Sequence, residues 1–272
     1  GRMPSGQEYS DIFLFQLYPY ASVHLGREGM LGGEARDRIA GFWSALGGVP
    51  PAEPDHLAAL IGLYLSLAER EADSDGAERT LNEEARRALL AEHLVPWVFA
   101  YLARVIEITE GPYGRWAELL HAVLKEEVRR AGVAEGSVAA THIREVPPLG
   151  DPRREGAADF LEGLLAPVRA GVLLTRADLG QIARSGDLGL RAGERRYALE
   201  HLLAQDPPRV LELLAVEARR QARSHMDRVG WLGVSSAELS RRAEATAVLL
   251  DELAEEERAG LHEDEASEAV IT

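Results

Sequence analysis

The chain has 272 residues and a formal net charge of −15, and 46% of its residues are hydrophobic. This hydrophobic content supports a substantial core and excludes a globally disordered chain. The acidic balance disfavours binding to nucleic-acid phosphates and anionic membranes. The sequence has no cysteine, which excludes disulfides, thiolate zinc sites and thiol catalysis. No apolar run has the length of about 18 residues that is typical of a transmembrane helix.

Helical periodicity begins at residues 34–46, where apolar residues recur at i, i+3, i+4 and i+7. These residues are Ile39, Phe42, Trp43 and Leu46. The Gly-Gly-Val-Pro-Pro segment at 47–51 ends this helix. A second helix begins near Asp55, because Pro54 suits the entry to a helix and not its interior. Its predicted core stripe consists of Leu57, Leu60, Ile61, Tyr64, Leu65 and Ala68.

Three further helices are predicted before residue 131. After a polar break at 73–76, Asn82 is the expected N-cap of a helix that continues to Leu94. Pro96 begins the next helix, and Gly111-Pro112 precedes the third, which ends near Arg130. Their predicted core residues are Leu89, Leu90, Leu94, Trp97, Tyr101, Leu102, Val105, Tyr113, Trp116, Leu119, Leu120, Val123 and Leu124.

The helical pattern lapses after residue 131. We expect a linker at 133–155 with a short extended piece at 139–146. Apolar periodicity resumes at Phe160, and Thr175 with Asp178 matches a capping box. More helices are predicted at 191–203, 208–229 and 235–258, followed by a frayed acidic tail at 261–272. Together these elements predict an all-α protein, a compact helical bundle of about ten helices.

Glu53, Pro54, Asp55 and His56 form the first candidate functional motif. In one interpretation the Asp55 carboxylate only caps the helix, where the helix dipole also favours its charge. In the other, two carboxylates and an imidazole on one rim hold a guanidinium through charge-assisted hydrogen bonds. The sequence leaves both interpretations open.

Two further motifs flank this one. Residues 18–25 read Tyr-Pro-Tyr-Ala-Ser-Val-His-Leu, and Pro19 restricts the backbone so that two aromatic rings surround a rigid corner. Such a loop could also simply pack against the core. Residues 93–97 read His-Leu-Val-Pro-Trp, and we expect His93 and Trp97 to be mainly structural.

The order of the three motifs resembles the TorD/DmsD family of cytoplasmic redox-enzyme maturation chaperones. The resemblance extends over roughly residues 8–130. Glu-Pro-Asp-His is complete, and Pro19, Tyr20, Ala21 and Ser22 match a Pro-aromatic-small-Ser pattern. The resemblance implies a cytoplasmic chaperone that is not an enzyme. The sequence carries no signature of a catalytic, metal or cofactor site, and none is expected.

The resemblance also implies the partners. The chain would bind the twin-arginine signal peptide and the apo form of a molybdenum-cofactor oxidoreductase, assist cofactor insertion and delay export. Its acidic charge suits a basic peptide, and a groove lined by Tyr20, Val23, Leu25, Trp43 and Leu60 would take the apolar segment of that peptide. The candidate peptide-binding residues are Tyr18, Pro19, Tyr20, Ser22, Val23, Leu25, Trp43, Glu53, Pro54, Asp55, His56, Leu60, His93 and Trp97.

The chain departs from the family at both ends. Only 18 residues precede Pro19, where family members have several helices, and a long helical part follows the recognisable region. We therefore expect residues 156–260 to replace those helices and to pack on a core at 1–132 as one cooperative unit. The packing would occur within one chain or by domain exchange in a homodimer.

Two other functions have partial support in the sequence. Residues 174–203 have the helix, glycine turn and helix pattern of a helix-turn-helix DNA-binding motif. In such a motif Arg191, Arg195 and Arg196 would contact phosphates. An ordinary helical hairpin explains the same pattern, and the acidic chain argues against nucleic acid. His24, Glu53, Asp55, His56 and His93 could gather around a metal, but their spacing matches no ligand pattern. We expect neither of these functions, and no stable membrane insertion.

Overall fold

The computed structural model describes residues 3–133 and 141–271, with side chains up to Gly260. Within these residues all regular structure is helical, apart from one isolated β-bridge between Tyr20 and His56. In the described part of the chain, ten α-helices have nine or more residues, which confirms the predicted all-α bundle. They are α3 (Gly33–Ala45), α4 (Leu57–Asp73), α5 (Gly76–Ala88), α6 (Val98–Ile108), α7 (Pro112–Ala131), α10 (Ala157–Leu165), α12 (Arg176–Gly186), α13 (Arg195–Leu203), α14 (Pro207–Met226) and α16 (Val234–Ile271).

Shorter helical segments connect these helices. Six α-helices have only four or five residues: α1 (Gly6–Tyr9), α2 (Ala21–Leu25), α8 (Thr141–Glu145), α9 (Pro152–Glu155), α11 (Pro167–Ala170) and α15 (Val229–Leu232). Two π-helical segments, η1 (Ser10–Leu14) and η2 (Leu89–Leu94), follow α1 and α5.

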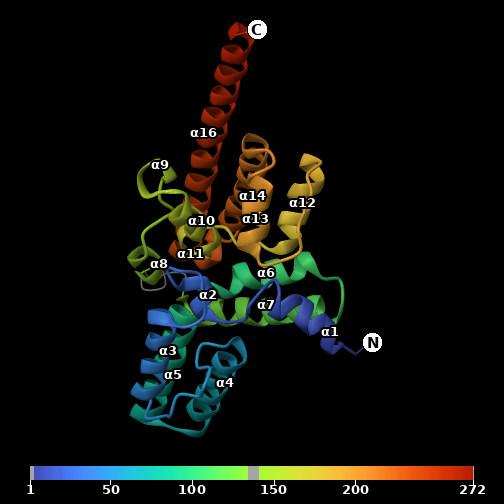
Figure 1. Cartoon of the computed structure of the whole chain (residues 1–272). Helices are drawn as coiled ribbons and strands as arrows, with labels where there is room; N and C mark the ends of the chain where they lie inside the picture. The colour runs from blue at the N-terminus through green and yellow to red at the C-terminus, as the bar shows by residue number, and fades with distance from the viewer. Residues whose placement is uncertain (1–2, 134–140, 272) are drawn as a thin grey trace.

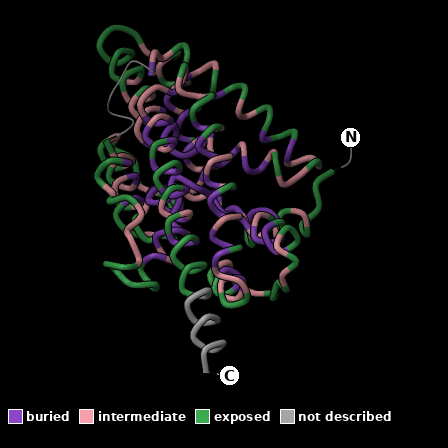
Figure 2. Tube along the Cα trace, turned by 90° about the horizontal axis from the view of Figure 1, so that it is seen from above, coloured by how far each residue is buried: buried purple, intermediate pink, exposed green. Residues whose placement is uncertain are grey.

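Two hydrophobic clusters divide the molecule. The first cluster is built mainly from α3 to α7 and the N-terminal segment, and the second from α10 to α14 and α16. Figure 1 shows the two groups one above the other, with α14 and α16 side by side in the upper group. Hydrogen bonds from Ser236 to the His225 carbonyl (2.6 Å) and from Ser240 to the Ala222 carbonyl (2.9 Å) show that α14 and α16 run antiparallel. Buried residues follow the inner faces of the helices in both groups (Figure 2).

The two groups are joined by apolar contacts. Trp231 of α15 packs edge-on against Phe99 of α6, with 4.8 Å between the ring centroids. Leu173 and Leu232, which come from the C-terminal half, belong to the first cluster. A few residues of the C-terminal half therefore pack in the first cluster.

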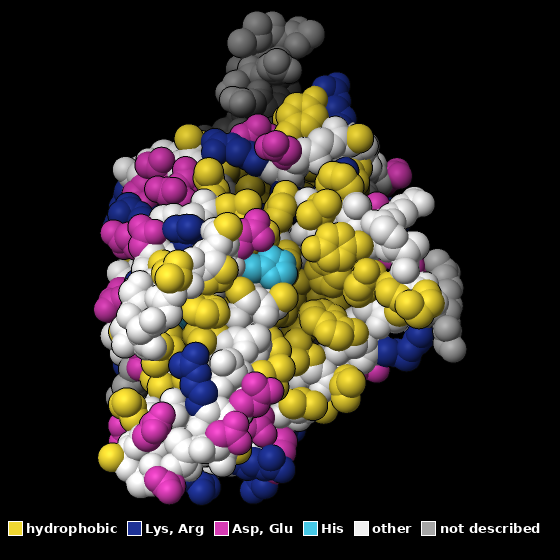
Figure 3. Space-filling model, turned by 90° about the horizontal axis from the view of Figure 1, so that it is seen from below, with side chains coloured by type: hydrophobic (Ala, Val, Ile, Leu, Met, Phe, Trp, Pro, Cys, Tyr) yellow, Lys and Arg dark blue, Asp and Glu magenta, His cyan; other side chains and the backbone are white. Residues whose placement is uncertain are grey.

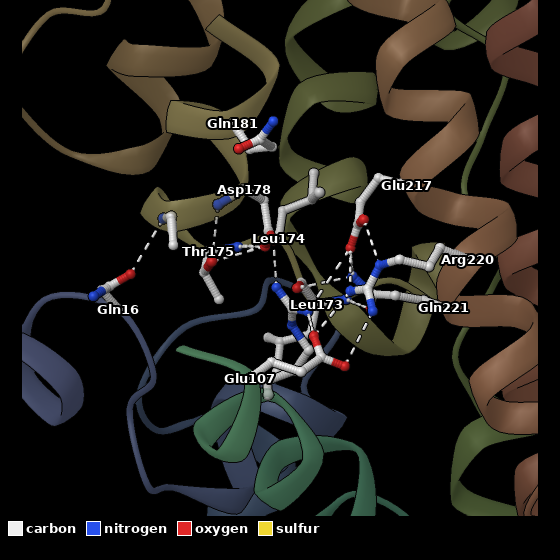
Figure 4. A network of polar contacts seen from close by, with 12 residues as sticks. Gln16, Glu107, Leu173, Leu174, Thr175, Asp178, Gln181, Glu217, Arg220 and Gln221 are labelled. Carbon is white, nitrogen blue, oxygen red and sulfur yellow. Dashed lines mark hydrogen bonds and ion pairs between the residues drawn. The ribbon is translucent and has the colours of Figure 1, made fainter. Parts of the chain in front are cut away.

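A network of charged groups crosses the same junction. Arg104 of α6 is buried and pairs with Glu107 of its own helix and with Asp178 of α12. Arg220 of α14 donates two hydrogen bonds to Glu107, each 3.0 Å long. Figure 4 shows Glu107 on α6 facing Arg220 and Glu217 of α14. Because each buried charge has an opposite partner, the junction does not contain an isolated buried ion.

The helix termini confirm some local predictions. Thr175 and Asp178 form a capping box, in which the Thr175 N–H donates to the Asp178 carboxylate (2.7 Å) and the Asp178 N–H donates to the Thr175 hydroxyl (3.2 Å). Pro112 begins α7, where its missing N–H costs nothing, and Gly132 ends it with a left-handed φ of 61°.

Other boundaries differ from the prediction. Helix α5 begins after Asp75, so Asn82 is not a cap but lies inside the helix and donates to the Ser74 hydroxyl. The predicted frayed tail is wrong up to Ile271, because α16 continues to that residue. Helix α13 begins at Arg195 rather than at residue 191.

The predicted linker at 133–155 contains two short helices, α8 and α9, and residues 134–140 of it lie outside the described part. The extended piece predicted at 139–146 is wrong where it is described, because residues 141–145 are helical. The buried Arg242 of α16 stabilises this helix end by donating to the carbonyls of Ile143 (2.6 Å) and Val146 (2.8 Å). These partners are too distant in sequence for local pattern analysis.

Within the described residues no single helix has the length and apolar content needed to cross a bilayer, and the bent pair 76–94 with 98–108 meets that test by length and composition alone.

Candidate functional site

An apolar groove of 650 Å³ opens on the first half of the molecule (Figure 3). One wall is α4 and the other is α7, with the N-terminal segment alongside. The residues that line it are Pro4, Tyr9, Phe13, Pro19, His56, Leu57, Ala58, Ile61, Gly62, Leu65, Tyr101, Pro112, Tyr113, Trp116 and Leu120.

Helix α4 is apolar on two faces. Leu60, Leu63 and Leu67 are buried in the first cluster. The groove face carries residues at i, i+3, i+4 and i+7, which lie on one side of a helix. These residues are Ala58, Ile61, Gly62 and Leu65. Leu65 was predicted to be a core residue, but its exposed fraction is 56% because it faces the groove.

Aromatic rings form the opposite side. Phe13 of η1 lies edge-on against Tyr113 (5.0 Å between centroids) and Trp116 (6.0 Å) of α7. Tyr9 packs on Phe13 at 5.2 Å. Edge-to-face contacts at these separations are favourable and hold the rings in fixed orientations. Trp116 was also predicted to be a core residue, yet 40% of it is exposed.

Helix α4 begins at the mouth of the groove. The Nδ1 atom of His56 accepts a hydrogen bond from the Ala58 N–H (3.0 Å), so the imidazole is the N-cap of α4. This bond fixes the ring, which also lies edge-on to Tyr20 with 4.8 Å between centroids. The His56 and Tyr20 rings, each with a polar atom, therefore lie side by side at this end of the groove.

An acidic group completes the rim. Burial raises the pKa of the Tyr20 hydroxyl to about 12, and a hydrogen bond to the Glu53 carboxylate adds to the rise. Glu53 itself is exposed. Figure 3 shows an acidic side chain beside a histidine at the edge of the apolar hollow. Glu53 and the Tyr20 oxygen can thus accept hydrogen bonds from a cation, whereas the His56 ring, whose Nδ1 atom already accepts from Ala58, presents an Nε2–H donor.

Asp55 does not belong to this rim. Its side chain is buried, and its Oδ2 atom accepts a hydrogen bond from the Ser22 N–H (3.1 Å) at the start of α2. Two backbone hydrogen bonds join the same segments. The Ala21 N–H donates to the Asp55 carbonyl (3.0 Å), and the Leu57 N–H donates to the Pro19 carbonyl (2.8 Å). Asp55 therefore caps α2 and not the helix that it precedes, and it holds the first two sequence motifs together.

The structure separates the other candidate residues. Pro19 and His56 line the groove, whereas Val23, Leu25 and Leu60 are buried in the core. The expectation that Val23, Leu25 and Leu60 line a groove is therefore corrected. Six more candidates do not line it either. Ser22, Pro54, His93 and Trp97 are buried, and Tyr18 and Trp43 are half-buried.

The motif at residues 93–97 packs in the core against the motif at residues 18–25. The His24 ring stacks on Trp97 with 4.9 Å between centroids, and the Trp97 indole N–H donates to the His93 carbonyl (2.8 Å). Burial lowers the pKa of both His24 and His93 to about 4, because the charged imidazolium loses its hydration. Both rings are therefore neutral at pH 7.

The alternative sites are not supported. Within residues 3–133 and 141–260, no three His, Asp or Glu side chains are placed to hold a metal ion. The arginines of the suspected DNA reader are used within the fold: Arg195 donates to the Leu174 carbonyl (2.8 Å), Arg196 pairs with Glu200 (3.0 Å) and Arg191 donates to the Tyr197 hydroxyl (3.0 Å).

Residues 5–103 match the family model described as nitrate reductase delta subunit. No curated protein and no solved structure matches the chain. The matched range includes all three sequence motifs and the α4 wall, and it ends within α6 before the α7 wall. Members of this family are chaperones for the maturation of redox enzymes, with a molybdoenzyme as the client. Over residues 5–103 the chain is therefore similar to the nitrate reductase delta subunit family, which confirms its resemblance to the TorD/DmsD-type maturation chaperones.

Proposed function

We propose that this chain binds the twin-arginine signal peptide of an apo-molybdenum-cofactor oxidoreductase in the groove between α4 and α7. The observation that carries the proposal is the apolar groove with an acidic rim, most of which is formed by residues that match the chaperone-family model. The chain would hold the apo-enzyme in the cytoplasm and delay its export until the cofactor is inserted.

The groove suits the apolar segment of such a peptide. Its walls consist of apolar and aromatic side chains from α4, α7 and the N-terminal segment. Full burial of one leucine side chain contributes about 1.5–3 kcal/mol, so a few such residues supply most of the binding free energy. The groove is also a large exposed apolar surface, and such surfaces are typical of interaction sites.

The rim suits the arginine pair. Glu53 supplies an exposed carboxylate, and the Tyr20 hydroxyl and the His56 imidazole lie beside it. A guanidinium forms short, strong hydrogen bonds with a carboxylate, and the net charge of −15 attracts a basic peptide from a distance. The arginines would therefore lie at the His56 end of α4 and the apolar segment along Ala58 to Leu65.

The walls also favour a helical peptide. Both walls are helices, whose backbone N–H and C=O groups are hydrogen-bonded within the helix. An extended peptide would leave its own backbone groups without partners against these walls, and that is costly. A helix satisfies its backbone internally and presents only side chains to the groove.

Calorimetric titration with a synthetic peptide tests the proposal. The peptide contains an Arg-Arg pair followed by a leucine-rich segment. Leu65→Asp places a charge in the groove, and we expect at least tenfold weaker binding. Leu81→Asp is the matched control, since Leu81 is 65% exposed on α5 and does not line the groove. Equal affinities for the wild-type chain and Leu65→Asp would refute binding in this groove.

The rim has its own test. Glu53→Gln removes the charge but keeps the shape and hydrogen-bonding atoms of the side chain. We expect weaker binding at low salt and a smaller loss of affinity as salt rises, because one charge pair is removed. A peptide with Lys-Lys in place of Arg-Arg should bind less tightly, since lysine cannot form the paired hydrogen bonds of a guanidinium.

A further inference from the structure

We infer that Gly62 determines the size of the side chain that the groove accepts, and thereby which client peptides bind. This inference rests on the proposed function, because it concerns the same groove. Gly62 lies on the groove face of α4, between Ile61 and Leu65, and it alone on that face has no side chain. The two flanking residues and the bare backbone between them form a notch in the wall.

The fold does not require glycine at this position. A Cβ atom built on Gly62 would meet nothing within 4 Å, so no neighbouring atom excludes a side chain. Its φ is not in the left-handed region, so the backbone does not favour glycine either. Glycine in a helix interior is less stable than any other residue except proline. Gly62 therefore weakens the helix without relieving a close contact, and the space that a side chain would occupy stays part of the groove.

Gly114 of α7 shows the contrast. A Cβ atom there would lie 2.4 Å from the Thr109 carbonyl oxygen, so close packing accounts for glycine at that site. At Gly62 the space is open to the groove that Trp116 and Tyr113 also line, where an occupant would lie. We therefore expect a bulky apolar side chain of the peptide to enter the notch, while a small one would leave part of it empty.

The substitution Gly62→Leu tests the inference, because leucine would fill the notch and strengthen the helix. Gly41→Leu is the matched control. Gly41 lies within α3, is exposed, has open space around a Cβ atom and does not line the groove. Both variants should melt at the temperature of the wild-type chain or above it. With the Arg-Arg, leucine-rich peptide, we expect at least tenfold weaker binding for Gly62→Leu and less than a twofold change for Gly41→Leu.

A peptide series shows whether the effect comes from the notch. Each apolar residue of the peptide is replaced in turn by alanine. The wild-type chain should lose affinity most at the residue that enters the notch, whereas Gly62→Leu should be insensitive to that same change. Additive effects at every peptide position would overturn the inference.

The outcomes separate this inference from the proposed function. Wild-type affinity in Gly62→Leu, together with the loss in Leu65→Asp, would overturn the role of Gly62 and leave groove binding in place. Failure of the wild-type chain to bind the peptide at all would overturn both.

Discussion

The backbone N–H of Ser22 donates to the carboxylate of Asp55 across 33 positions of sequence, and both residues are buried. This single bond joins the Pro-aromatic motif to the Glu-Pro-Asp-His motif. Together with the backbone bonds on either side, it sets the positions of Tyr20 and His56 at the mouth of the groove. Asp55 thus shapes the candidate site from within the core.

Asp55→Ala should lower the free energy of unfolding by about 1–3 kcal/mol, because a buried N–H loses its acceptor. Asp55→Asn should cost less, since its amide oxygen can still accept the hydrogen bond. Urea unfolding of the two variants and the wild-type chain measures the difference. If Asp55→Ala is as stable as the wild-type chain, the bond to Ser22 contributes nothing to the fold.

Stability should fall as the pH is lowered from 6.5 towards 4. Burial lowers the pKa of His24, His93 and His225 to about 4, so each ring is neutral in the folded chain where an unfolded histidine would already be protonated. Nearby Arg195, Arg38 and Arg228 act in the same direction on these three rings. The stabilisation is complete above pH 6.5 and is lost as the pH falls towards 4.

Each of these histidines contributes a slope of up to about 1.4 kcal/mol per pH unit in that range. Urea unfolding at pH 7, 6 and 5 measures the total slope. His225→Asn should be less stable at pH 7 but should have a smaller slope, because one titrating group is removed. A flat profile in the wild-type chain would show that these rings bind protons in the folded state as they do in the unfolded chain.

Arg104→Ala should destabilise the whole chain by about 3–5 kcal/mol, since it leaves Asp178 without its buried cation and Glu107 with Arg220 alone. Arg196→Ala is the control, because its pair with Glu200 is exposed and is worth at most about 1 kcal/mol. Tryptophan fluorescence and circular dichroism should give one coincident transition in urea. Two separate transitions would show that the halves unfold independently, contrary to the predicted cooperative unit.

Mixed-sequence duplex DNA should not be retarded by the chain in moderate salt. The arginines that a helix-turn-helix reader would use are hydrogen-bonded within the fold, and the net charge repels phosphates. A gel-shift titration measures this directly. Retardation that disappears in an Arg191→Ala, Arg196→Ala variant would instead favour the DNA-binding alternative.

The local parts of the fold could be predicted from sequence. Apolar periodicity located the longer helices, and the Thr175–Asp178 capping box was recognisable because all its atoms lie within four residues. Asn82 misled the prediction because asparagine is also tolerated within a helix, while Asp75 precedes the true start. The helix at 141–145 was missed because its stabilising partner, Arg242, is almost a hundred residues away.

The candidate site was predicted only in part. The motifs identified Pro19 and His56, but periodicity assigns every apolar residue of a helix to the core. The apolar arcs of α4 and α7 are wider than one buried face requires, since Leu65 and Trp116 extend them. Apolar residues beyond those needed for one buried face were the feature of the sequence that could have predicted a groove. The role of Asp55 could not be predicted, because its hydrogen-bond partner is set by the tertiary fold.

The two walls of the groove differ in origin. The α4 wall lies within the residues shared with the chaperone family, whereas Tyr113, Trp116 and Leu120 of α7 lie beyond them. One side of the groove is therefore built from residues that match the family model, and the other from residues beyond the match. Grafting a different α7 surface onto this scaffold should redirect the chain to other clients while the motif-bearing wall stays intact.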